Sequence, residues 1–205
     1  KTYKIKGIYS HQETGDFLSY KRDQKVRRWS KENNIPWKEY IQFRVFRGPL
    51  ERDKWAKTHK KHFEKEIIYI TKVFKALPFK EESLPSDNFF DFENDKCNGR
   101  CKGGRKEAIN RLNYFLNNEI YSYAKNISSP SKSYFSCSRL SPYITMGCIS
   151  LKEILKHTKL VKTKDSKMFT SRLFWHCHFI QKLETQPELE FKEYHPYFEN
   201  IRIKN

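Results

Sequence analysis

The chain has 205 residues, which fits one large domain or two modest ones, and its 37% hydrophobic and 16% aromatic residues are enough to build a hydrophobic core. Lysine and arginine number 41 against 24 acidic residues, and the net charge of +17 favours a polyanionic partner such as nucleic acid or an acidic membrane face. Because no run of about 18 apolar residues occurs, we expect no membrane-spanning helix.

The first 77 residues predict a strand, a helix and a second strand. Residues 4–9, KIKGIY, alternate as a strand does, and helical sequence then runs up to the breaker NNIP at residues 33–36. Residues 37–43, WKEYIQF, are the second strand candidate, and a basic segment follows up to about Lys65. Strand, helix and strand at these lengths are typical of an α/β unit with a parallel sheet.

Residues 78–98 are rich in proline, serine and acids, which predicts a linker between two units. Residues 99–205 then predict an all-helical unit. Its segment 105–126 places apolar side chains on one stripe at three- and four-residue spacing, which is typical of a long amphipathic helix. The stripe consists of Ala108, Leu112, Phe115, Leu116, Ile120 and Tyr123.

Two further helices are predicted in the second half. Ser150 and Glu153 form a capping-box pattern, so we expect a helix to begin after Ser150. Residues 168–184 predict another helix. Its aligned apolar side chains are Phe169, Leu173, Ile180 and Leu183. Residues 130–149 are then an irregular connection between two helices.

That connection overlaps the stretch SYFSCSRLSPYITMGCIS, residues 133–150, which carries no acid in a chain crowded with charge. Its donors are the hydroxyls of Ser136, Ser138 and Ser141 and the guanidinium of Arg139. Converging donors with no acid nearby suit an anion, especially a phosphate or diphosphate. The alternative is that the serines only cap local turns.

Several segments carry a resemblance to a known family. The segments GGRKEAINRLNYFL, YAKNISSPSKSYFSCSRLSPYITMGCIS and FTSRLFWHCHFIQKLE resemble, in order and spacing, the first part of the FAD-binding domain of the cryptochrome/photolyase family. YSHQETGDFLSYKRDQKVRRWSKENNIPW and RVFRGPLERDKW resemble the last part of its α/β antenna domain. The resemblance implies a central fragment of such a protein. Residues 1–77 would be the C-terminal part of the antenna domain, 78–98 the linker, and 99–205 the N-terminal part of the helical FAD-binding domain.

The resemblance also implies an FAD site in the connection. The family's diphosphate-wrapping loop corresponds to Cys137, Ser138, Arg139, Leu140 and Ser141. Cys137 stands where family members usually carry threonine, and a thiol is a poorer donor than a hydroxyl. The tyrosine that the family places upstream of this loop matches Tyr123, with Tyr121 as the alternative.

The family's catalytic tryptophan at the lesion pocket matches Trp175, whose ring would stack on a base extruded from DNA. The alternative is a plain core tryptophan. Arg172 stands where dimer-repairing members carry a glutamate, and His176 where arginine is common. The resemblance therefore assigns Arg172 and His176 to the same DNA-facing surface.

The function that the resemblance implies is FAD-dependent, blue-light-driven repair of pyrimidine lesions, with damaged DNA as the partner and a monomer as the working form. The alternatives are a cryptochrome-type flavin photoreceptor without repair, and a basic nucleic-acid-binding remnant without flavin. A second antenna chromophore of unknown identity would lie near the turn SHQETG.

Cysteine and histidine usage predicts neither disulfides nor a metal site. The five cysteines are odd in number and scattered, unlike a secreted disulfide framework, so we expect a protein of the reducing cytoplasm. His176, Cys177 and His178 are potential metal ligands, but consecutive helical residues point about 100° apart and cannot close on one ion.

Overall fold

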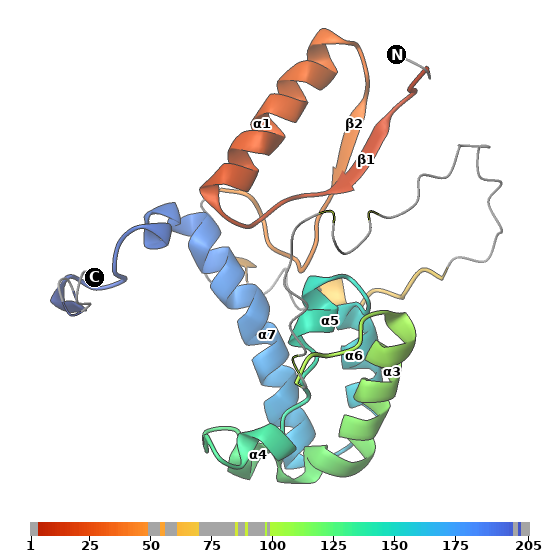
Figure 1. Ribbon diagram of the computed structural model, residues 1–205, viewed down its shortest axis with the longest axis vertical. Coiled ribbons are helices and arrows are strands. Elements are labelled where there is room, and N and C mark those ends of the chain that lie inside the picture. Colours follow the sequence, from red (N-terminus) through yellow and green to blue (C-terminus); the bar gives the residue numbers. More distant parts are fainter. Residues whose placement is uncertain are drawn as a thin grey trace.

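The computed structural model describes residues 4–48, 54–55, 61–69, 85, 89, 97, 99–198 and 201. Almost all of the predicted linker at 78–98 lies outside the described residues. Within them, a small parallel sheet with one helix comes first and helices follow (Figure 1). The coarse prediction of an α/β unit followed by helices is therefore confirmed.

The N-terminal unit contains β1 (Ile8–His11), α1 (Phe17–Glu32) and β2 (Trp37–Tyr40). Its two strands pair in parallel, with Ile8 opposite Trp37, which confirms the predicted strand–helix–strand unit. The predicted start of the first strand at residue 4 is wrong. The ladder begins where the amide of Ile8 donates to the carbonyl of Pro36 at 2.8 Å, because β2 begins only after this proline.

Local hydrogen bonds explain where α1 begins and ends. Asp16 Oδ1 accepts from the amide of Ser19 at 2.7 Å, and this bond lowers the pKa of Asp16. After the helix, Asn34 adopts the left-handed region with φ of 53°, and the amide of Ile35 donates to the carbonyl of Ser30 at 2.9 Å. The breaker predicted at residues 33–36 therefore ends the helix.

A network of charges joins α1 to β2 and to the segment after it. Arg47 contacts Asp23 on α1 and lies 2.9 Å from Glu39 on β2, and Arg27 lies 2.6 Å from Glu39. Burial raises the pKa of Asp23, but hydrogen bonds from Arg22 and Arg47 outweigh burial and hold this pKa below its ordinary value. The network therefore holds Arg47 against the sheet and helix.

The predicted long helix at 105–126 is four shorter helical pieces. They are α3 (Arg105–Tyr114), a π turn (Phe115–Glu119), a 3-10 turn (Ile120–Ser122) and α4 (Tyr123–Asn126). The prediction of one continuous helix is wrong, because the wide π turn and the tight 3-10 turn interrupt its hydrogen-bond ladder. The predicted apolar stripe is confirmed, since all six side chains are at most 7% exposed.

The later helices are α5 (Ser141–Thr145), α6 (Leu151–Thr158) and α7 (Lys164–Thr185), with 3-10 turns at Ser133–Phe135, Pro187–Glu190 and Pro196–Phe198. The predicted capping box of Ser150 and Glu153 is confirmed. The connection at 130–149 is less irregular than expected, because Pro142 in the first turn of α5 favours helix entry. No helix in the described part of the chain combines the length and apolar character needed to cross a membrane.

The inward face of α7 differs from the predicted stripe. It buries Phe169, Leu173, Cys177 and Gln181, whereas Ile180 and Leu183 are only half-buried. Gln181 is tolerated in the core because its side chain is satisfied on both atoms. Its Oε1 accepts from the amide of Phe46 at 2.8 Å, and its Nε2 donates to the carbonyl of Phe46 at 3.0 Å. This pair of bonds ties the N-terminal unit to α7.

Candidate functional site

The predicted diphosphate loop, residues 137–141, is held by Arg111 of α3. Arg111 donates through Nε to the carbonyl of Ser138 at 2.8 Å and through Nη2 to the carbonyl of Cys137 at 3.0 Å. The same guanidinium pairs with Glu119. Because these carbonyls are satisfied within the protein, the loop has a defined backbone without any ligand.

The serine hydroxyls of this stretch differ in their availability. Ser136 is buried and accepts from Asn126 Nδ2 at 2.8 Å, and Ser138 Oγ accepts from the amide of Leu140 at a long 3.4 Å. Ser141 is exposed, and its hydroxyl has no hydrogen-bond partner in the part of the chain that is described. The Ser136 hydroxyl is therefore held by side chains 10 and 14 residues away in the sequence, whereas Ser138 makes only a weak local bond to the amide two residues later.

Arg139 gives the loop a positive charge. Its backbone is left-handed, with φ of 55°, and its guanidinium lies 3.9 Å from the ring centroid of Tyr134. The next residue, Leu140, is 1% exposed and anchors the loop in the core. Arg139 forms no ion pair with any acid of the described residues, so its charge is uncompensated.

Tyr123 lies beneath this loop and not on the surface. It is 4% exposed and packs edge-on against Phe115 and Phe169, with ring centroids 5.8 and 5.3 Å apart. Burial raises its pKa to about 12, Cys137 adds to this effect and Arg172 opposes it. The structure therefore brings Tyr123, Cys137 and Arg172 into one neighbourhood, whereas the alternative Tyr121 is 60% exposed.

Trp175 lies on the outer side of α7 with Arg172 one turn before it. The guanidinium of Arg172 lies 4.1 Å from the Trp175 ring centroid, a cation–π contact, and Phe179 meets the same ring edge-on at 6.0 Å. Trp175 is 47% exposed, so the core interpretation of this tryptophan is wrong. Arg172 Nε is buried with no partner among the described residues.

His176 lies on a different side of α7 from Trp175. Its ring packs against Phe43 of the N-terminal unit at 4.9 Å, and burial lowers its pKa. His178 packs against Trp55 at 5.8 Å between ring centroids. No group of three or more potential ligands that could hold a metal ion occurs among the described residues.

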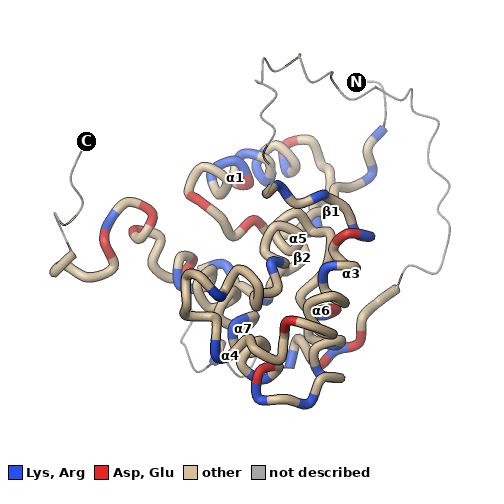
Figure 2. Tube along the Cα trace, turned by 60° about the horizontal axis from the view of Figure 1, so that its bottom comes forward, with Lys and Arg blue, Asp and Glu red and all other residues tan. Residues whose placement is uncertain are grey.

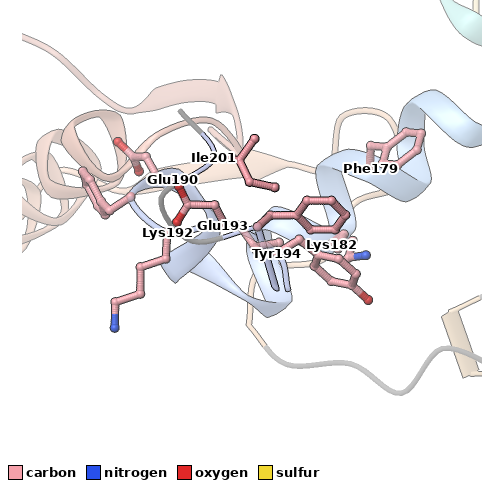
Figure 3. A pocket seen from close by; sticks show the side chains of 10 residues that line it. Phe179, Lys182, Glu190, Lys192, Glu193, Tyr194 and Ile201 are labelled. Atoms are coloured by element: carbon pink, nitrogen blue, oxygen red, sulfur yellow. The ribbon is translucent and has the colours of Figure 1, made fainter. Parts of the chain in front are cut away.

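An open aromatic hollow lies between the C-terminal part of α7 and the segment that follows it, and was not anticipated from the sequence. Its volume is about 710 Å³, and Figure 3 shows Phe179 and Lys182 of α7 facing the C-terminal segment. Lys182 Nζ lies 3.3 Å from the ring centroid of Tyr194. The sequence signal was the aromatic run after residue 190, which follows no helical or strand period.

Lysine and arginine residues occur along both units, and α1 carries many of them (Figure 2). Those of α1 are Lys21, Arg22, Lys25, Arg27, Arg28 and Lys31. Most of this helix surface is exposed, so these charges are accessible to a polyanion.

Comparison with known proteins adds no relative. The chain matches no model of a known protein family, and no curated protein sequence matches it significantly.

Proposed function

We propose that this chain acts as part of a flavin-dependent, light-driven DNA-repair protein of the photolyase type. The observation that carries the proposal is the half-exposed Trp175 with Arg172 on its ring. An accessible aromatic ring can stack on a flipped base, and a neighbouring guanidinium can donate to the base or its phosphate. The net charge of +17 supports a DNA partner.

The loop residues fit an anionic cofactor such as FAD. Arg139 offers an uncompensated positive charge, and Ser141 offers a hydroxyl that has no partner among the described residues. The Oγ of Ser138 only accepts from an amide, so its O–H is available to donate to a phosphate oxygen. FAD, when bound, would supply the photochemical electron transfer. The protein's part is to hold the diphosphate at the loop and to present Trp175 to DNA.

A cryptochrome-type photoreceptor without repair is the second candidate. Arg172 takes the place of the family's lesion-contacting glutamate, and its guanidinium covers one face of the Trp175 ring. That face cannot stack on a base while the contact persists.

The test uses the full-length protein with bound, reduced FAD and ultraviolet-irradiated DNA under blue light. We expect light-dependent restoration of pyrimidines, and we expect Trp175→Ala to lower the repair rate about 5- to 150-fold because stacking contributes about 1–3 kcal/mol per base. The matched control is Trp29→Ala, which removes another half-exposed tryptophan, on α1, and should leave repair unchanged.

The outcomes separate the candidates. Absence of repair with reduced FAD bound would exclude the enzyme and leave the photoreceptor. Absence of flavin absorbance in the full-length protein would exclude both and favour a basic nucleic-acid-binding remnant.

A further inference from the structure

A cavity of about 350 Å³ lies between the N-terminal unit and the helical unit, near the C-terminal end of α5 and beyond the diphosphate loop. Its wall comes from the segment after β2, from residues 62–63 and from the N-terminus of α6. The wall includes the apolar Phe43, Phe63, Ile144 and Ile149 and the basic His62 and Lys152. No aspartate or glutamate is among its described lining residues, whereas a neighbouring hollow includes Glu64 and Glu66.

Arg44 stands directly behind His62. Its Nη1 lies 3.1 Å from His62 Nδ1, and since a guanidinium can only donate, the imidazole accepts through Nδ1 and is neutral. Arg44 Nε is buried and has no partner among the described residues. Phe43 and Arg44 both adopt the left-handed region, with φ of 52° and 54°, which is uncommon for residues other than glycine.

The positive charges around His62 are not paired with acidic side chains of the described residues. Burial lowers the pKa of His62 to about 4, and three neighbouring cations add to this effect. These cations are Lys152, Arg44 and Lys65. Burial, Lys65 and Arg44 also lower the pKa of Lys152. None of the four residues pairs with a carboxylate of the described chain, and Glu153, next to Lys152, is engaged by an arginine of α3 at 2.5 Å.

The start of α6 adds a further positive contribution. Ser150, Leu151 and Lys152 all line the cavity, and the first amides of a helix have no partner within the helix. The positive end of the helix dipole therefore lies beside the lysine, and the Glu153 carboxylate, which accepts from the Ser150 amide at the same end, offsets part of it. An apolar chamber with Lys152 and the His62 ring on its wall, and with Arg44 bonded to that ring, is suited to a molecule that has a ring and an anionic group.

We propose that this cavity binds a small phosphate ester of a ring compound, with the phosphate at Lys152 and the Arg44–His62 pair and the ring against Phe43 and Phe63. A bound dianion would offset the repulsion among the cations, and the aromatic walls would bury the ring. The site is separate from the flavin loop and from Trp175, so it does not depend on the proposed function.

The test titrates the full chain with phenyl phosphate, inorganic phosphate and phenol by calorimetry. We expect phenyl phosphate to bind more tightly than either of the others, because only it supplies both the ring and the charge. Lys152→Gln should lower the affinity for phenyl phosphate about tenfold, which is the effect of losing one charged hydrogen bond. The matched control is Lys167→Gln on the exposed side of α7, which should leave the affinity unchanged.

A second readout separates a binding role from a structural one. Because the cations repel one another, Lys152→Gln should leave the Tm of the unliganded protein unchanged or higher. A lower Tm with lost binding would make Lys152 structural and overturn the proposal. Equal affinities of the two variants, or no saturable binding of phenyl phosphate, would also overturn it. If Lys152→Gln instead weakened only the binding of duplex DNA, Lys152 and its neighbouring cations would be a contact to the DNA backbone, and the proposal would be overturned.

Discussion

Burial keeps the two weak acids nearest the loop, Cys137 and Tyr123, in their neutral forms, because it raises the pKa of both. With a diphosphate held at this loop as proposed, the thiol of Cys137 would be a weaker donor than a hydroxyl and would add no negative charge. Arg139 would supply the positive charge.

His62 predicts an acid-sensitive fold. Its folded-state pKa of about 4 lies below its ordinary value of 6.5, so the unfolded chain binds the proton first and stability falls as pH drops from 6.5 to 4. The slope from this residue is at most about 1.4 kcal/mol per pH unit, and solvent screening reduces it. Urea unfolding measured at several pH values in this range should show that the free energy of unfolding depends less steeply on pH in His62→Gln. The exposed His195→Gln should match the natural chain, and equal slopes for all three would contradict the prediction.

Features of the helices and strands that depend on nearby sequence could be predicted, whereas features that depend on packing could not. The parallel strands, the end of α1 and the capping box of α6 follow from sequence neighbours. The π turn after α3 depends on how Phe115 and Ile120 pack, and the burial of Gln181 depends on a partner 135 residues away. Sequence periodicity contains neither piece of information.

The capping box gives a prediction for α6. Ser150→Ala removes the acceptor for the amide of Glu153 and should lower the free energy of unfolding by about 1 kcal/mol. Chemical denaturation measures the loss, and Ser141→Ala is the control because that hydroxyl has no partner among the described residues. An equal loss in both variants would show that the cap is not the cause.

For the whole molecule, the basic charge spread over both units predicts salt-sensitive binding to DNA (Figure 2). If about 6–10 phosphates are contacted, affinity for undamaged duplex should fall about 10³- to 10⁵-fold between 50 and 200 mM salt. Fluorescence anisotropy against salt measures this slope. Arg28→Gln on α1 should reduce the slope and Trp175→Ala should not, since only the first removes a charge. A flat salt profile would exclude the basic surface as the DNA-binding face.

The sequence could propose residues for the candidate site, but it could not predict how they are arranged in space. The pattern of the sequence singled out Ser138 and Arg139, and the resemblance gave them roles and added Trp175. It could not show that Arg172 covers the Trp175 ring or that His176 faces the N-terminal unit, because both depend on the rotation of α7 against its neighbours.

The link between Gln181 and Phe46 sets a narrow limit on which residues position 181 can accept. The site needs a donor and an acceptor on one side chain, long enough to reach a backbone that offers the complementary pair. Ionised glutamate has no donor for the carbonyl, asparagine is one methylene short, and an apolar residue would leave both backbone groups unpaired. A library randomised at this codon and selected for folded protein should therefore return glutamine almost alone.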